Sequence, residues 1–556
     1  IIDGDDFGDG VDDADADGDG VDDGDEPGVV GDIRLGSGAD TLDIRNGGVF
    51  GDIDFGGGAD VLKISGGAQV RGAFSDSNLL AITVTDGTIE ATNTTAVTIA
   101  SLDIGSEGDL VATVNPDTDT VSGFNVTGTA TFADGAGLGI RFTDLIDYGT
   151  TSEEFTIVSA GTLNVGNLDL STLDSNTPFM YIATAEVQGN NLVLDVRLRN
   201  AEEAGFIASE AAAFESIYGA LSQDGAIRNA LLSRLNRSDF MDLYRQLMPE
   251  HSGAPLLSLE AGIDAVRHAL SDRTVHAPAG ETTAWLQEIN FYADKQQNQS
   301  YAFRAEGFGV AGGLERGGPR GNFGISGAYT SSDMKDRMAV LDEVLTAQLF
   351  ELGVYYRLNR DDWRLWARGA AGYAMFDGTR EVIAGGFQRK YDGDWDGYSL
   401  SAGVGASYDM RWRKWYARAE GSLEYFSLME NAYCEADDRS GSPGYCVEDR
   451  EGHIFKAEAT MNIGRRFGEE IWFTPEFRFG WRHNISAEIG ATTARPNFAG
   501  GIPFTLYADA IEGGGPVLGF RLMAGSGMGF LGIEGNAVLI DDYDLYNLMI
   551  RGGFRF

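Results

Sequence analysis

The most constraining feature of the sequence is a strict alternation of apolar and polar residues within residues 280–556. In residues 349–358, Phe350 and Leu352 would lie on one face of an extended strand and Glu351 on the other. Successive side chains of a strand point to opposite sides, so this period predicts strands with one apolar face. The pattern recurs in residues 415–426, 455–464 and 471–482. Alternation alone fits a soluble sandwich, with apolar faces inward, or a membrane barrel, with apolar faces toward lipid.

The connections between these strands alternate in length, which favours the membrane barrel. Short turns are expected near residues 317–321, 359–362, 411–414, 465–470 and 525–527. Long polar loops are expected near residues 331–343, 377–396, 430–452 and 485–513. Outer-membrane barrels have short periplasmic turns, long external loops and an even number of strands. Counting the alternating segments predicts a twelve-stranded antiparallel transmembrane β-barrel that ends at Phe556.

Residues 29–200 carry a different signal, a repeat with a period of 20. The sequence Gly-Asp-Ile at residues 31–33 recurs at residues 51–53, and Ala-Asp-x-Leu at residues 39–42 recurs at residues 59–62. A period near 20 with short β segments predicts one coil of a β-helix per repeat. The inward positions would be Leu42, Ile44, Leu62 and Ile64. Asp40 and Asp60 would then stack one above the other, either as calcium ligands or as simple turn residues.

Residues 201–279 shift to a composition rich in Ala, Leu, Glu and Arg, which predicts a helical linker. Helical periodicity covers residues 202–219 and 227–248. A further helix is expected near residues 255–273, with Leu259 on its apolar face and Asp264 on its charged face. This helix is either part of a small helical subdomain or a plug whose charges meet a polar barrel lumen.

Residues 1–28 form an acidic head with thirteen Asp or Glu and no Lys or Arg. Five of these acids, together with Gly20, match the spacing of a twelve-residue calcium loop. The predicted calcium ligands are Asp15, Asp17, Asp19, Asp23 and Glu26. The alternative is a solvated acidic tail. The net charge of -44 disfavours nucleic acid as a partner and favours cations.

The chain has two cysteines, Cys434 and Cys446, close together in a polar stretch. We predict a local disulfide in the external loop between strands seven and eight, with two free thiols as the alternative. Ile1 opens directly in the acidic tract without a signal peptide, so we expect further residues before it.

Catalysis within the first 250 residues is limited by composition. They contain no histidine and no cysteine, which excludes a Ser-His-Asp triad or a His-ligated metal site there. Paired carboxylates for glycoside hydrolysis remain open, but no pair stands out. We therefore predict no catalytic residues, and no cofactor other than calcium.

The order of these parts resembles the type V autotransporters: a Gly-rich β-helix, a helical linker, a twelve-stranded barrel and a terminal Phe. The segment Tyr-Arg-Gln-Leu-Met-Pro-Glu-His-Ser-Gly at residues 244–253 is similar to the one that precedes the barrel in many members. The resemblance implies that Phe554 and Phe556 belong to a signal recognised by the barrel-assembly machinery. It also implies a barrel in outer-membrane lipid and lipopolysaccharide, with an extracellular passenger. The Asn-Asn cleavage junction of the family is not evident in the linker.

We therefore expect a mostly β protein with a right-handed β-helix passenger, a helical linker and a C-terminal barrel. The expected function is surface display of a non-enzymatic, adhesive or structural passenger that binds a surface ligand or matrix. Two alternatives are an enzymatic domain upstream of residue 1 and a porin-like channel.

Overall fold

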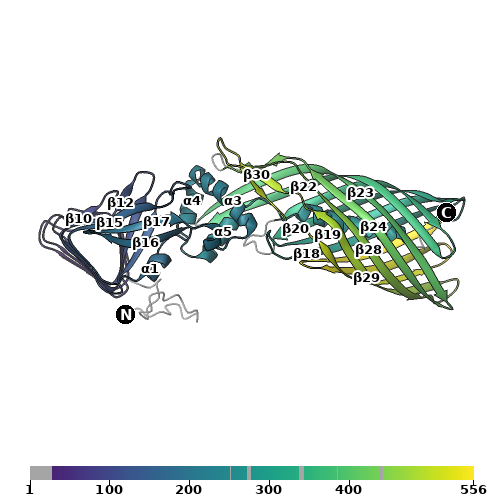
Figure 1. Ribbon diagram of the computed structural model, residues 1–556, viewed down its shortest axis with the longest axis horizontal. Helices are drawn as coiled ribbons and strands as arrows, with labels where there is room; N and C mark the ends of the chain where they lie inside the picture. Colours follow the sequence, from purple (N-terminus) through teal and green to yellow (C-terminus); the bar gives the residue numbers. More distant parts are fainter. Residues whose placement is uncertain are drawn as a thin grey trace. The chain divides into compact units, whose positions relative to one another are not determined.

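The structure is a computed structural model that describes residues 28–555, except residues 251, 272–276, 337–343, 385 and 438–442. The chain forms two compact units (Figure 1). The first comprises Ile1–Gly205 with Asp224–Tyr244, and the second comprises Phe206–Gln223 with Arg245–Phe556. All of the acidic head except Gly28 lies outside the described residues.

The first unit begins with short strands stacked in parallel at the spacing that the repeat predicts. One stack contains β1 (Gly28–Val30), β4 (Gly48–Phe50), β7 (Gln69–Gly72) and β9 (Ala81–Ala91). A second contains β3 (Thr41–Ile44), β6 (Val61–Ile64) and β9, and a third contains β2 (Ile33–Arg34), β5 (Ile53–Asp54) and β8 (Phe74–Ser75). Leu42 pairs with Leu62 across the second stack. Leu62 and Ile64 are fully buried, because alternate side chains of each coil point inward.

The remainder of the first unit combines long strands with a few short ones. These are β10 (Val97–Ile99), β11 (Ser101–Asn115), β12 (Thr120–Ser122), β13 (Phe124–Phe132), β14 (Gly137–Phe142) and β15 (Glu153–Val165). They are followed by α1 (Leu170–Ser175), β16 (Tyr181–Gln188) and β17 (Asn191–Leu198). Strands β9, β11, β13 and β15 pair in parallel, in that order. Strand β15 then pairs antiparallel with β17, which pairs antiparallel with β16. The right-handed β-helical form of the passenger stays a prediction.

The linker is helical, but each of the two segments with helical periodicity, residues 202–219 and 227–248, is interrupted. The observed helices are α2 (Ala201–Ala204), α3 (Ala208–Ala220), the 3-10 turn η1 (Leu221–Gln223), α4 (Gly225–Leu232) and α5 (Arg237–Gln246). Gly205 ends α2 in the left-handed conformation, with φ of 65°. Before α5, the Asn236 side chain accepts a hydrogen bond from the Asp239 amide at 3.0 Å, which starts a new helix. None of the helices in the described residues is long and apolar enough to span a membrane.

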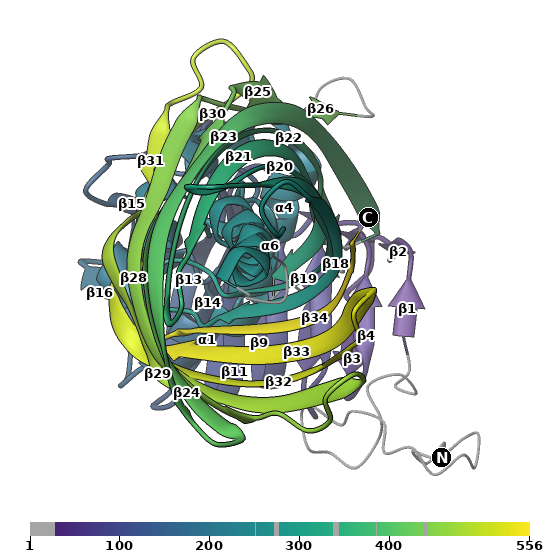
Figure 2. The same ribbon diagram turned by 90° about the vertical axis from the view of Figure 1, so that its right-hand side faces the viewer.

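The second unit contains the predicted antiparallel barrel, and the described residues supply twelve strands to it. These strands are β18 (Thr282–Lys295), β19 (Phe303–Gly318), β20 (Gly321–Asp336), β21 (Leu345–Asn359), β22 (Trp363–Ala384), β23 (Phe387–Trp412), β24 (Trp415–Glu430), β28 (Arg450–Arg465), β29 (Trp472–Glu488), β32 (Gly513–Gly525), β33 (Gly529–Ile540) and β34 (Tyr543–Arg555). The barrel closes because β18 pairs with both β19 and β34. Figure 2 shows the ring of strands from one end.

The barrel wall has the inverted polarity that the alternation predicts for a membrane barrel. Leu352 is 77% exposed on the outer face, whereas neighbouring Glu351 is 1% exposed. The long loop predicted at residues 377–396 is wrong, because β22 and β23 continue as a paired hairpin up to Ala384 and Phe387. Val382 and Tyr391 are buried in this extension, so apolar packing stabilises it beyond the wall.

Candidate functional site

The most distinctive site is the barrel lumen, which contains α6 (Ala254–Ser271) (Figure 2). Leu259, Val266 and Leu270 of this helix are fully buried against the wall. Gly262 permits the approach, since a Cβ there would lie 3.0 Å from Thr330 and 3.1 Å from Phe291. The helix predicted near residues 255–273 therefore lies inside the barrel.

The charged face of α6 is paired with charges on the opposite wall of the lumen. Asp264 accepts hydrogen bonds from Lys456 at 2.6 Å and from Arg482 at 2.9 Å. Lys456 also pairs with Glu260, one turn before Asp264 on the same helix. Because a carboxylate removed from water is costly without a partner, these contacts are what allow Asp264 to be buried.

The following turn of α6 continues the same pairing. Arg267 forms ion pairs with Glu458 and Glu424, each at 3.0 Å. His268 lies 3.0 Å from the carboxylate of Glu534, on the neighbouring part of the wall. At the end of the helix, Arg357 donates a hydrogen bond to the Leu270 carbonyl at 3.2 Å, which satisfies an acceptor that the helix itself leaves free. The network thus holds the helix in place along three consecutive turns.

The lumen beside α6 has little free space. A cavity of about 40 Å³ lies between the helix and the wall, lined by Asp264, Arg267, Lys456 and neighbouring residues. This volume accommodates only a few water molecules. The arrangement is that of a closed, charge-paired plug.

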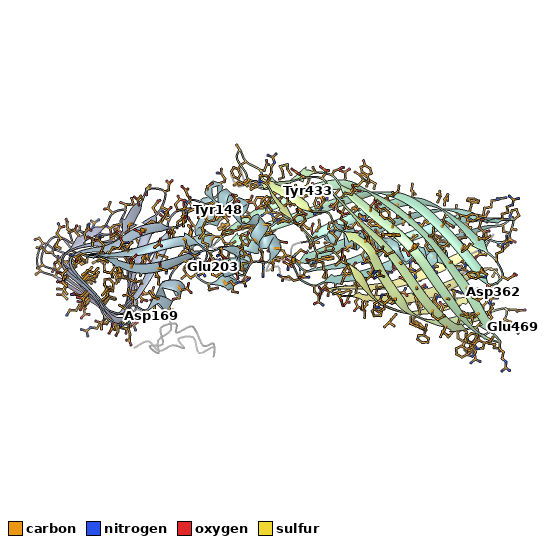
Figure 3. The ribbon with its side chains drawn as sticks, in the orientation of Figure 1. Tyr148, Asp169, Glu203, Asp362, Tyr433 and Glu469 are labelled. Carbon is orange, nitrogen blue, oxygen red and sulfur yellow. A yellow bond between two sulfur atoms is a disulfide. The ribbon has the colours of Figure 1, made fainter. Side chains whose placement is uncertain are left out.

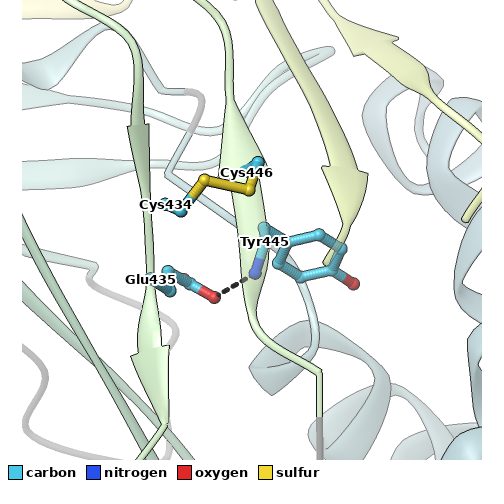
Figure 4. The surroundings of a disulfide bond; sticks show 4 residues. All are labelled: Cys434, Glu435, Tyr445 and Cys446. Carbon is cyan, nitrogen blue, oxygen red and sulfur yellow. Dashed lines mark hydrogen bonds between the residues drawn. A yellow bond between two sulfur atoms is a disulfide. The ribbon is translucent and has the colours of Figure 1, made fainter. Parts of the chain in front are cut away.

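Cys434 and Cys446 form the predicted disulfide, between the seventh and eighth barrel strands, with their Cα atoms 3.9 Å apart (Figure 4). They lie on β25 (Tyr433–Cys434) and β27 (Tyr445–Val447) of a small antiparallel sheet that includes β30 (Thr492–Pro496) and β31 (Phe504–Leu506). Beside the disulfide, Glu435 accepts a hydrogen bond from the Tyr445 amide at 2.8 Å. Helix α3 packs on this sheet, where Ser216 donates to the Ile502 carbonyl at 2.6 Å. No sequence pattern reveals this sheet, because its strands are only two to five residues long.

The two ends of the barrel carry different connections. Figure 3 places Tyr433 of the small sheet at one end, and Asp362 and Glu469 of two short turns at the other. Short turns at one end and structured long loops at the other are the arrangement of outer-membrane barrels.

Among the carboxyl groups of the first unit, Glu203 and Asp109 have pKa values shifted in opposite directions. Hydrogen bonds from Arg197, and then from the Asn200 amide, lower the pKa of Glu203 to about 2. Burial, and then the nearby charge of Asp169, raises the pKa of Asp109. Asp109 is half-buried on β11 and Glu203 is exposed on α2, and no histidine occurs in residues 1–250.

The remaining predicted site residues are placed only in part. The calcium ligands Asp15, Asp17, Asp19, Asp23 and Glu26, and the terminal Phe556, lie outside the described residues. The backbone of Phe554 pairs with Ala284 and Gly529, which closes the barrel. Within the described residues, no group of three or more His, Cys, Asp or Glu is arranged to hold a metal ion.

Residues 284–528 match the family described as Autotransporter beta-domain. Solved structures with a similar fold include the translocator domain of autotransporter NalP from Neisseria meningitidis, with 14% identity, a TM-score of 0.42, and coverage of 55% of this chain and 99% of that chain. The transport unit of the autotransporter AIDA-I from Escherichia coli has 12% identity, a TM-score of 0.35, and coverage of 55% and 100%. The beta domain of the Bordetella autotransporter Brka has 13% identity, a TM-score of 0.34, and coverage of 49% and 99%. No curated protein sequence matches the chain.

The closed barrel and its family match define an outer-membrane translocator. The second unit is therefore the translocator barrel of a type V autotransporter, which lies in the bacterial outer membrane with its passenger exposed at the cell surface.

Proposed function

We propose that this autotransporter displays a non-enzymatic passenger with an adhesive or structural role. The observation that carries the proposal is the architecture of the first unit. Its stacked coils bury Leu62 and Ile64 inside and turn polar side chains such as Asp43 and Lys63 outward. Such stacked surfaces suit extended contacts with another surface or polymer. The absence of histidine and cysteine from residues 1–250 supports the non-enzymatic role.

The barrel serves export and anchoring, and a porin-like role is disfavoured. The paired charges of Asp264 and Arg267 hold α6 in the lumen, and the cavity between these residues and the wall is only about 40 Å³. A porin needs a continuous aqueous channel. Purified wild-type barrel in planar bilayers should therefore show no steady, large conductance.

The proposed partners follow from the exposed surfaces. Outward side chains such as Leu352 and Val354 would contact lipid and the acyl chains of lipopolysaccharide. The terminal residues Phe554 and Phe556 would be recognised by the barrel-assembly machinery. The acidic head would bind calcium through Asp15, Asp17, Asp19, Asp23 and Glu26. The passenger would bind a surface ligand or matrix.

The central experiment compares bacteria that display the full chain with bacteria that display a chain lacking residues 28–200. Cells with the full chain should adhere to a matrix-coated surface or to one another, and external protease should remove both the passenger and the adhesion. The shortened chain keeps the linker and barrel, so it controls for effects of barrel expression. Equal adhesion by both strains would reject the adhesive role.

A further inference from the structure

Two aspartates in the first coils of the passenger stack directly on each other. The turns at residues 36–40 and 56–60 lie one above the other, because the strands that follow them pair in register. The Asp40 amide donates a hydrogen bond to Oδ1 of Asp60 at 2.8 Å. Asp60 is 1% exposed, so its carboxylate lies inside the stack.

The second carboxylate oxygen of each residue is left without a hydrogen-bond partner. Oδ2 of Asp40 and Oδ2 of Asp60 are both buried, and neither is hydrogen-bonded within the described part of the chain. The next coil offers no polar group at the equivalent place, which is occupied by the fully buried Leu80. A buried charge without a partner is strongly unfavourable, and two adjacent ones repel each other as well.

Glycine turns bring further oxygen atoms to the same stack. Gly56 has φ of 69°, and a Cβ there would lie 2.3 Å from the Gly36 carbonyl oxygen and 2.7 Å from the Leu35 carbonyl oxygen. Only glycine permits this approach of the two turns. Oδ2 of Asp40 folds back over its own turn, 3.9 Å from the Cβ position of Gly36. Carboxylate and main-chain carbonyl oxygens are the ligands that calcium prefers in proteins.

We propose that Asp40 and Asp60 bind a calcium ion between the first two stacked turns, with main-chain carbonyl oxygens and water completing the coordination. Calcium tolerates irregular geometry and mixed carboxylate and carbonyl ligands, whereas magnesium demands a regular octahedron and retains its water. The displayed passenger faces the external medium, where sites with Kd of about 10⁻⁴–10⁻³ M are effective. The bound ion joins neighbouring coils and stabilises the stack by mass action. This site is distinct from the one proposed for the acidic head.

The test measures calcium bound by the full-length chain in detergent, by equilibrium dialysis with radioactive calcium. The test variant is Asp60→Asn, whose side-chain oxygen still accepts the Asp40 hydrogen bond. The matched control is Asp52→Asn, in the same coil and with a similar hydrogen bond, from the Ala73 amide at 2.9 Å, but on the exposed surface. Both variants keep the acidic head intact and lose the same charge.

The expected result is that Asp60→Asn loses one bound calcium ion per chain, or binds it at least about tenfold more weakly, whereas Asp52→Asn binds as the wild type does. Calcium should also protect residues 30–75 from protease in the wild type and the control, but not in Asp60→Asn. Equal calcium binding by Asp60→Asn and the wild type would overturn the proposal. So would equal loss in both variants, which would indicate only diffuse attraction to acidic charge.

Discussion

The passenger and the barrel use the same alternating pattern but bury opposite faces. In the passenger, Leu62 and Ile64 are fully buried and Lys63 between them is exposed. In the barrel, Leu352 faces outward and Glu351 is buried. An alternating pattern shows only that every second residue lies on the same face of a strand. The solvent on each side decides which face is apolar, so an exposed apolar side chain in the barrel is not a defect of folding.

The two regions also treat buried charge differently. Within the barrel, Asp264, Arg267 and Lys456 all have partners of opposite sign at hydrogen-bonding distance. Within the passenger, Asp60 is equally buried, yet its Oδ2 has no hydrogen-bond partner among the described residues. The charged face of α6 is thus paired with charges of the barrel wall, whereas we propose that the first coils of the passenger depend on an ion from the medium.

The largest expected effect comes from breaking the barrel network with Asp264→Ala. Lys456 and Arg482 would lose a shared partner in a buried site, which typically costs about 3–5 kcal/mol. A closed barrel resists detergent until it is heated, so its folded form migrates differently from its boiled form on a denaturing gel. The variant should lose this difference at a lower temperature. Ser258→Ala, which removes only a neutral hydrogen bond from the same helix to Ser332, should change it little. Identical transition temperatures for all three proteins would contradict the role of the network.

A direct comparison of the two polarities uses one leucine from each region. Leu62→Ala should destabilise the passenger by about 2–5 kcal/mol, because it leaves a cavity in a packed interior. Leu352→Ala should change the barrel far less, since lipid occupies the space that the side chain vacates. Chemical unfolding would measure the first effect, and the gel transition temperature would measure the second. Equal destabilisation by both substitutions would contradict the inverted polarity.

Much of the fold follows from local sequence patterns. The alternation seen at Phe350, Glu351 and Leu352 is enough to predict the strands of the barrel wall. The number of alternating segments equals the number of barrel strands observed, twelve. The repeat of Leu42 at Leu62 is enough to predict the parallel stack. These predictions succeed because periodicity depends only on backbone geometry.

The missed features depend on contacts between distant residues. Helix breaks near Gly205 and Asn236 are set by capping contacts that compete with strong helical periodicity on both sides. The partners of Asp264 lie 192 and 218 residues away, and their meeting requires the exact height of α6 within the barrel. The charged face of the helix and the inward charges of the wall were visible in the sequence. Their pairing was not, because no local signal fixes the register between them.

A smaller effect is expected from the disulfide, which lies outside the barrel wall. The wild-type chain, unfolded without reductant, should contain no free thiol, because Cys434 and Cys446 are its only cysteines. Replacing both with serine should raise protease cleavage within residues 433–447. The loss in the free energy of unfolding should not exceed about 2–3 kcal/mol, because the loop that the disulfide closes is short. The gel transition of the barrel should stay unchanged, and a large fall in it would show that the small sheet supports the wall.

The smallest expected effect concerns Glu203, at the end of the passenger unit, and it depends on pH. Its carboxylate pairs with Arg197 at 2.7 Å and accepts a hydrogen bond from the Asn200 amide at 3.0 Å. The pKa is lowered to about 2, below the ordinary value of 4.5. The folded state therefore favours the charged form, and the resulting stability is present above about pH 4.5 and lost as the pH falls toward 2.

Glu203→Gln should accordingly destabilise the passenger at neutral pH and be nearly neutral near pH 2. Both side chains of the pair are about a third exposed, so solvent screening limits the effect to less than about 1 kcal/mol. Unfolding is measured in urea at low salt. Guanidinium chloride is itself a salt and would screen the ion pair. Glu202→Gln, on the same short helix and exposed, is the matched control. If Glu203→Gln and Glu202→Gln show the same pH dependence, the ion pair with Arg197 does not stabilise the junction between the last passenger strand and α2.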